Sequence, residues 1–198
     1  MAVASGIKNS PFIGIDEFHI AKLLTDDETG ATYDEIISFP WLRSVQIEPE
    51  TADDTLYADN HAVAVANATN KYNLTIETAT LPIEYRGLLL GHTVENGVMK
   101  VHGDDAAPYF CIKFTINKQN GKKRYVMFPK TQFSEPSENP QTKEENTTFN
   151  TPTINATAIY RDWDRISLIQ ADEEAADYAK ITGDSWYTAI EPVTSTTP

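Results

Sequence analysis

The chain has 198 residues, of which 40% are hydrophobic and 10% aromatic, so it can bury one sizeable core and is not a disordered acidic chain. Its formal net charge of -13 argues against a general nucleic-acid binder, because affinity for phosphates comes from clustered lysine and arginine. The single cysteine, Cys111, lies in an apolar run and excludes an internal disulfide.

Short β-strands separated by turns are predicted over the first 80 residues. The clearest is the last, in which Leu74 and Ile76 alternate with Asn73 and Thr75, so one face of its sheet should be wet. A cluster of turn formers at residues 25–30 predicts a hairpin between the first two strands. The expected strands are 13–24, 31–39, 44–48, 55–58, 61–65 and 71–80.

The pattern then changes to one short helix. Pro82 stands at its start and Gly91 just past its end, with apolar residues at helical spacing between them. After it, Asn96-Gly97 between apolar residues predicts a tight hairpin. A second hairpin is expected to pair residues 110–116 with 125–128 across 117–124.

The last third combines a long loop with two further elements. Residues 131–146 contain two prolines among polar neighbours and form the longest expected loop, after which 147–160 alternates as a long strand. An acidic front followed by alanines predicts a short helix over 171–180. Ser185-Trp186-Tyr187 is expected to form a final apolar clamp.

One domain is predicted, with an appendage at each end. Residues 13–190 form the domain, 1–12 an N-terminal arm and 191–198 a flexible C-terminal tail, because both ends lack periodicity and carry small residues and proline. No secretion signal and no apolar run of membrane-helix length is present, so we expect folding in the cytoplasm and no membrane contact.

No pattern predicts catalysis, a metal or a cofactor. The four histidines fall in no metal-binding spacing, and phosphate-loop, nucleophile-elbow and dinucleotide motifs are missing from the sequence. Neighbouring carboxylates on an extended chain point in opposite directions, so turn or surface positions explain them better than glycoside hydrolysis. The sequence therefore favours a protein that is not an enzyme. The carboxylate pairs considered are Asp26-Asp27, Asp53-Asp54, Asp104-Asp105 and Asp162-Trp163-Asp164.

Charge is segregated along the chain. Ten acidic residues lie between Asp26 and Asp59 against Arg43 alone, whereas residues 109–131 hold six cations and no acid. The two groups either meet head to tail between copies of the chain, which generates rings or fibres, or the cations pair within their own subunit. The candidate interface residues are Asp26, Asp27, Asp53, Asp54, Asp59, Lys122, Lys123 and Arg124.

The order and spacing of several segments, covering roughly Gly14 to Tyr187, resemble the major tail proteins, or tail-tube proteins, of long, non-contractile-tailed bacteriophages. The segments that carry this resemblance are Tyr57-Ala58-Asp59-Asn60, Tyr72 to Ala79, Leu81-Pro82, Leu90-Gly91, Glu95-Asn96-Gly97, Phe110 to Ile116, Gly121 to Tyr125, Phe133 to Pro136 and Thr142 to Thr147.

This resemblance implies a mainly β fold, a two-sheet β-sandwich or barrel-like tail-tube domain with one short flanking helix and extended arms or loops. It implies hexameric rings that stack into a tube, through which DNA passes without specific binding. The candidate residues named above are then interface or lumen candidates, since a carboxylate-rich bore would repel the phosphates of DNA. The implied partners are other copies of the chain, a tape-measure protein, and the tail-initiating and tail-terminating proteins. The implied location is the virion tail, with assembly in the host cytoplasm.

Two other classes of protein stay open. A monomeric carbohydrate- or surface-binding β-sandwich module would use exposed aromatic residues, and an enzyme would use Asp162 and Asp164 or Asp104 and Asp105. The aromatic residues concerned are Trp41, Tyr57, Trp163, Trp186 and Tyr187.

Overall fold

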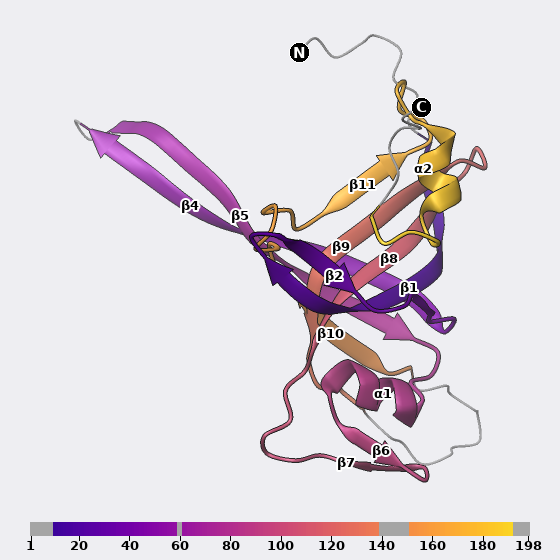
Figure 1. The fold of residues 1–198 in the computed structure, drawn as a ribbon. Helices are drawn as coiled ribbons and strands as arrows, with labels where there is room; N and C mark the ends of the chain where they lie inside the picture. The colour runs from indigo at the N-terminus through magenta and orange to yellow at the C-terminus, as the bar shows by residue number, and fades with distance from the viewer. Residues whose placement is uncertain (1–9, 59–60, 139–150, 192–198) are drawn as a thin grey trace, which may run out of the picture.

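A computed structural model describes residues 10–58, 61–138 and 151–191, with the side chains of 52–58, 61–68 and 181 left out. Within these residues the fold is mainly β, as predicted (Figure 1). The strands are β1 Phe12–Asp27, β2 Gly30–Tyr33, β3 Ile37–Ser38, β4 Leu42–Ala58, β5 His61–Thr78, β6 Thr93–Glu95, β7 Val98–Lys100, β8 Tyr109–Lys118, β9 Lys123–Phe133, β10 Thr153–Ala158 and β11 Ile169–Asp172, and the helices are α1 Ile83–Leu90 and α2 Lys180–Ser185.

The strands form one large sheet and one small one. The nine-stranded sheet runs β2-β1-β8-β9-β10-β5-β4, with β3 paired to β1 and β11 to β9, and β6 pairs with β7 in a separate hairpin. β1 also approaches β4, although the two are far apart in the strand order. The large sheet therefore curls on itself, which confirms the expected barrel-like fold.

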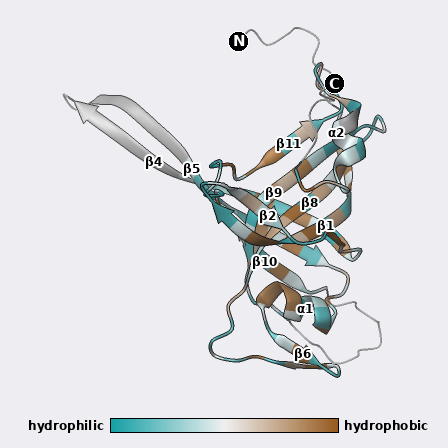
Figure 2. Cartoon of the chain, viewed as in Figure 1, coloured by the Kyte–Doolittle hydropathy of each residue, from teal (hydrophilic) through white to brown (hydrophobic). Residues whose placement is uncertain are grey.

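The main core lies inside this curl. Alternate side chains of β5 and β8 face inward, among them Leu74, Ile76 and Phe114, each 1% exposed. Figure 2 shows hydrophobic residues concentrated along β8, β9 and β10 and on α1, which packs against one end of the core. The predicted helix is confirmed, with Pro82 before its first turn and Gly91 in the left-handed region at φ 76°.

A second apolar cluster covers the opposite face of the same sheet. We define residues 180–191 as the C-terminal clamp. Its Trp186 is 0% exposed and packs on Cys111 and Tyr125. The buried Lys113 Nζ donates to the Trp186 carbonyl at 2.8 Å and to the Ala189 carbonyl at 2.6 Å. Burial lowers the pKa of Lys113. The apolar clamp expected at residues 185–187 is thus confirmed.

Two expectations were wrong in detail. Residues 171–180 are not a helix, because Ile169–Asp172 pairs with β9 and α2 begins only at Lys180. Sheet pairing and ion pairs override the local helix preference of this segment. Similarly, the short strands expected at 44–48, 55–58 and 61–65 belong to the two continuous strands β4 and β5.

Most other elements agree with the prediction. The hairpins β1–β2, β6–β7 and β8–β9 are confirmed, and Asn96 and Gly97 both have positive φ, as a tight turn requires. β10 covers the middle of the long strand expected at 147–160. The expected loop 131–146 begins later than predicted, since β9 continues to Phe133, and residues 139–150 lie outside the described residues.

The distal part of the β4–β5 hairpin projects away from the body (Figure 1). We call residues 51–58 and 61–69 the arm. Its root is tied to the body, since the Tyr160 hydroxyl donates to the Thr69 carbonyl at 2.7 Å. In the part of the chain that the structure describes, no helix is long and apolar enough to cross a membrane.

Candidate functional site

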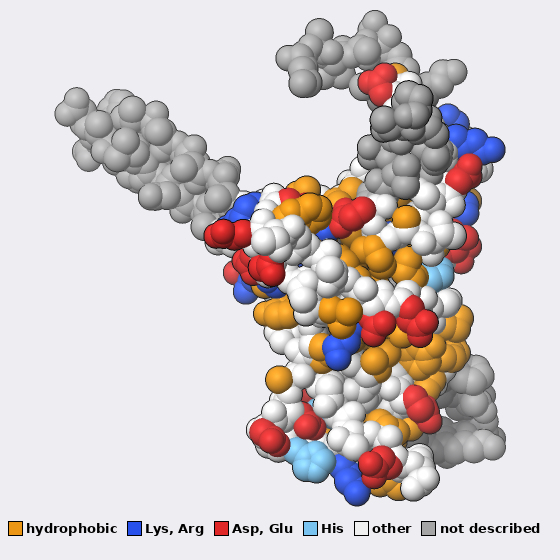
Figure 3. Space-filling view, viewed as in Figure 1, with side chains coloured by type: hydrophobic (Ala, Val, Ile, Leu, Met, Phe, Trp, Pro, Cys, Tyr) orange, Lys and Arg blue, Asp and Glu red, His pale blue; other side chains and the backbone are white. Residues whose placement is uncertain are grey.

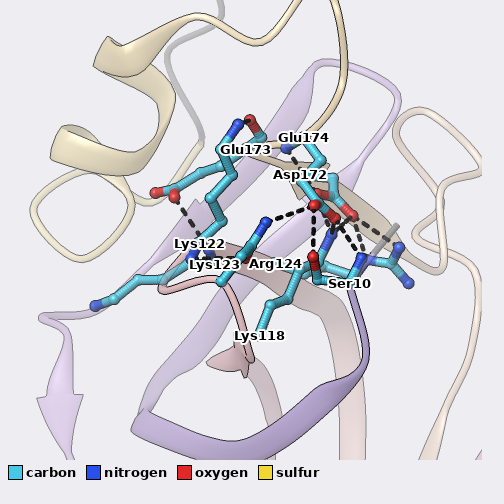
Figure 4. Close-up of polar contacts among 9 residues, drawn as sticks. Ser10, Lys118, Lys122, Lys123, Arg124, Asp172, Glu173 and Glu174 are labelled. Carbon is cyan, nitrogen blue, oxygen red and sulfur yellow. Dashed lines mark hydrogen bonds and ion pairs between the residues drawn. The ribbon is translucent and has the colours of Figure 1, made fainter. Parts of the chain in front are cut away.

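A charged corner lies where β8 ends, β9 begins and β11 runs alongside (Figure 4). We define it as Lys118, Arg124, Asp172 and Glu174. The side chain of Lys118 is 0% exposed, and its Nζ donates to both Asp172 and Glu174. Arg124 Nε donates to Asp172 Oδ2 at 2.8 Å. Buried ions need such partners, so the corner fixes the relative positions of these strands.

The register of the sheet builds this corner. Asp172 is the direct cross-strand partner of Arg124, so the β11–β9 pairing brings the two charges together. Burial alone would raise the pKa of Asp172, but hydrogen bonds from Lys118 and from the Glu174 amide outweigh it and hold the pKa at about 2. Lys118 and the Ser10 amide hold the pKa of Glu174 at about 2 as well.

The corner also anchors the start of the described chain. The Ser10 amide and hydroxyl both donate to the Glu174 carboxylate, each at 3.1 Å, and the Gln119 amide donates to the Pro11 carbonyl at 2.9 Å. Ser10 and Pro11 therefore lie beside the tip of the β8–β9 hairpin.

Each of the three predicted basic residues has a partner in its own chain. Lys122 is exposed, and its Nζ donates to the Glu173 carbonyl at 2.9 Å. Lys123 Nζ lies 3.2 Å from Glu17 Oε2, and Arg124 binds Asp172. Lys and Arg side chains gather over the β8–β9 tip, at the upper right of Figure 3. These contacts support the alternative in which the cations pair within one subunit.

The predicted acidic residues do not meet the β8–β9 tip where their side chains are described. Asp26 accepts a hydrogen bond from Lys130 Nζ at 2.6 Å, and Asp27 accepts two from Thr29 in the β1–β2 turn. Asp53 and Asp54 lie in β4 on the arm, opposite Asn67 and Ala66, and their side chains are outside the description. Asp59 lies outside the described residues altogether.

The carboxylates considered for catalysis are engaged in structural contacts. Asp162 binds Lys130 at 2.8 Å and Asp164 binds Arg161, whereas Asp104 is exposed and Asp105 binds His92. Over the described ranges, no group of three His, Cys, Asp or Glu residues is placed to hold a metal ion. Burial raises the pKa of the Cys111 thiol to about 12, which opposes a nucleophilic role.

The aromatic residues considered for glycan binding are divided between core and surface. Trp186 is fully buried, and Trp41 and Tyr187 are partly buried against the two clusters. Trp163 is 42% exposed, and the side chain of Tyr57 is outside the description. Trp163 therefore stands apart from the others as an exposed indole.

Sequence reasoning missed a bridging histidine. His92, which follows α1, lies 2.8 Å from Asp105 through Nδ1 and 2.7 Å from Glu135 through Nε2. Because a carboxylate only accepts, both ring nitrogens must donate and the ring is an imidazolium. The bonds to Glu135 and Asp105 raise the pKa of His92. No spacing in the sequence links these three positions.

A comparison with family models matches residues 47–182 to the phage tail tube protein family. No curated protein sequence shows a significant match.

The similar solved structures include three with a TM-score of 0.42. The tube-sheath complex of an extracellular contractile injection system is 13% identical and covers 79% of this chain and 88% of its own. A chain from the tube-terminating cap of the anti-feeding prophage is 11% identical, and the match covers 87% of this chain and 95% of that one. A chain from its baseplate is 6% identical, and the match covers 83% of this chain and 97% of that one. On the match over residues 47–182, the chain belongs to the phage tail tube protein family.

Proposed function

We propose that this chain assembles into sixfold rings that stack into the tube of a long, non-contractile phage tail. The family membership supports a structural role in a tail tube. The single observation that supports self-assembly is that the arm projects away from the body of its own subunit (Figure 1).

The arm is poorly supported by its own chain. β10 pairs with β5 only over Tyr72–Glu77, and no other described strand pairs with β5 beyond Tyr72 except β4. Eight residues of β4, from 51 to 58, extend about 25 Å at the usual rise per residue. A two-stranded hairpin alone is at best marginally stable in water, so the arm is expected to pack on a neighbouring subunit.

Ring closure would use the free strand edges. β4 is the last strand in the order of the large sheet. Over Phe12–Asp16, β1 pairs with β8 along one edge and has no described partner along its other edge. Such edges carry unpaired backbone groups that readily pair with another chain. Pairing between two different edges is head to tail, and it closes a ring when the rotation between successive copies is a whole fraction of a full turn, one sixth for the proposed ring.

The charge of the chain suits a channel that conducts DNA without holding it. A net charge of -13 repels phosphates, and the cations of the β8–β9 hairpin tip already have partners. The acidic candidates for the lumen are Asp26, Asp27, Asp53, Asp54 and Asp59. We place the chain in the virion tail, with assembly in the host cytoplasm.

We further propose that the two terminal segments and one internal loop join neighbouring rings. These are the N-terminal arm 1–12, the C-terminal tail 191–198 and the loop predicted at 131–146. The expected partners are a tape-measure protein inside the tube and the proteins that initiate and terminate it. Removal of residues 2–11 should weaken ring stacking and leave the domain folded. Tubes of unchanged stability would contradict this role.

Shortening the arm tests the main proposal. Residues 52–68 are replaced by Asn-Gly, because Thr51 and Thr69 are paired in register and this turn closes a hairpin. Sedimentation velocity should show the wild-type chain growing in mass with concentration and the shortened chain staying monomeric. Circular dichroism and protection of Cys111 from thiol reagents check that the body is folded. Equal assembly of both chains would contradict the proposed use of the arm.

A further inference from the structure

We infer that Trp163, held on the turn Arg161–Arg165, is an anchor for contact with a neighbouring copy of this chain. This inference rests on the proposed function and adds a specific residue to it. The same turn carries Asp162 and Asp164, the carboxylates considered for catalysis, and both form ion pairs with basic residues of the chain.

The turn is rigid because its backbone and both carboxylates are bonded. The Arg165 amide donates to the Arg161 carbonyl at 3.1 Å, and the Ile166 amide donates to Asp164 Oδ1 at 3.1 Å. From β1, the Asp26 carboxylate accepts the amides of Asp162 and Trp163 at 2.9 and 3.1 Å. Little conformational freedom is left for Trp163 to lose on binding.

A buried cation supports the indole. Arg161 is 0% exposed, and its guanidinium lies 5.0 Å from the centre of the Trp163 ring. Hydrogen bonds to Asp164, Glu191 and Tyr33 hold that guanidinium in place. The ring therefore rests on a fixed base and is still 42% exposed.

Trp163 has the properties of an interface anchor. Large side chains fixed before binding, tryptophan above all, provide most of the energy of protein interfaces. The indole is held by its turn and by the cation beside it, and it is 42% exposed. We call this exposed indole the contact spot.

The position of this spot selects a second copy as the occupant. The β10–β11 connection that contains Trp163 lies beside the root of the arm in Figure 1, and Tyr160 in the same connection bonds Thr69 of the arm. The spot therefore lies on the connection that also holds the root of the arm. A glycan site would need hydrogen-bonding groups beside the ring that are not already used within the protein. Asp164 is bound to Arg161, and Asp162, although 60% exposed, already forms an ion pair with Lys130.

The test compares full-length wild-type protein with Trp163→Ala and the conservative Trp163→Phe. Electron microscopy and pelleting measure the critical concentration for assembly. Trp163→Ala should raise it at least tenfold, which corresponds to about 1.4 kcal/mol, and Trp163→Phe should raise it less than threefold. Acrylamide quenching should also show that one tryptophan becomes inaccessible when wild-type protein assembles, and that this change is missing in Trp163→Phe.

The outcomes separate the two proposals. If wild-type protein forms no rings or tubes, the proposed function fails and this inference fails with it. If wild type and Trp163→Ala assemble at the same concentration, or Trp163 stays open to quencher in the tubes, only the inference fails. Retention of the wild-type monomer on a chitin or peptidoglycan column, lost in Trp163→Ala, would also overturn the inference and favour a glycan site.

Discussion

Replacing Trp186 by alanine should open the C-terminal clamp and expose Cys111. The indole is fully buried, its ring centre lies 5.4 Å from that of Tyr125, and Lys113 binds its carbonyl. Removal of a buried tryptophan side chain costs about 3–5 kcal/mol. Since ordinary domains are stable by about 5–15 kcal/mol, the clamp should detach before the rest of the sheet unfolds.

Thiol labelling measures this directly. Cys111 is 1% exposed beneath the clamp, so its labelling rate reports how often the clamp opens. A loss of about 3 kcal/mol predicts labelling more than a hundredfold faster. Trp186→Phe is the matched control, because Trp186 Nε1 has no hydrogen-bond partner among the described residues and phenylalanine keeps most of the ring. Equal labelling rates for the wild type and Trp186→Ala would refute this account of the clamp.

Three further changes test other contacts. Lys118→Met leaves Asp172 and Glu174 without their shared cation, so it should lower the free energy of unfolding by about 3 kcal/mol at pH 7, as measured by urea titration. A change below about 0.5 kcal/mol, which is typical of a surface ion pair, would contradict the buried corner. The folded pKa of Asp172 is about 2 against an ordinary 3.8, so its contribution is complete above pH 3.8 and is lost as the pH falls towards 2, a loss that Lys118→Met should reduce. Because the pKa of His92 is raised in the folded protein, its contribution to stability is complete below pH 6.5 and is lost as the pH rises through the folded pKa. His92→Gln should remove this loss of stability at alkaline pH, and an unchanged profile of stability against pH would exclude the bridge. Gly91→Ala adds a Cβ 2.4 Å from the Ala106 carbonyl at φ 76° and should destabilise the chain by more than about 1 kcal/mol, whereas Gly103→Ala, where a Cβ meets nothing within 4 Å, should be nearly neutral.

Local elements were predictable where the signal was local. Pro82, Gly91 and Asn96-Gly97 determine backbone geometry at their own positions, so the helix and the tight hairpin could be read from the sequence. The alternation at Leu74 and Ile76 likewise gave the buried face of β5 correctly.

Features that depend on distant partners were not predictable. Residues 171–180 have helical composition, but Asp172 pairs with Arg124 across the sheet, 48 positions away in the chain. The bridge at His92 was not predictable for the same reason, since Asp105 and Glu135 are distant in the chain. The burial of Arg161 likewise depends on distant partners, Tyr33 and Glu191, besides the nearby Asp164. The charge segregation was visible in the sequence, but only the structure showed that Lys123 and Arg124 pair within one subunit.

The central claim is that copies of this chain close into rings and stack around an open axis. Cryo-electron microscopy of concentrated purified protein tests it most directly. We predict hollow tubes with sixfold symmetry in which the arm contacts a neighbouring subunit. Protein that stays monomeric at every concentration, or that forms assemblies without an open axis, would contradict the claim.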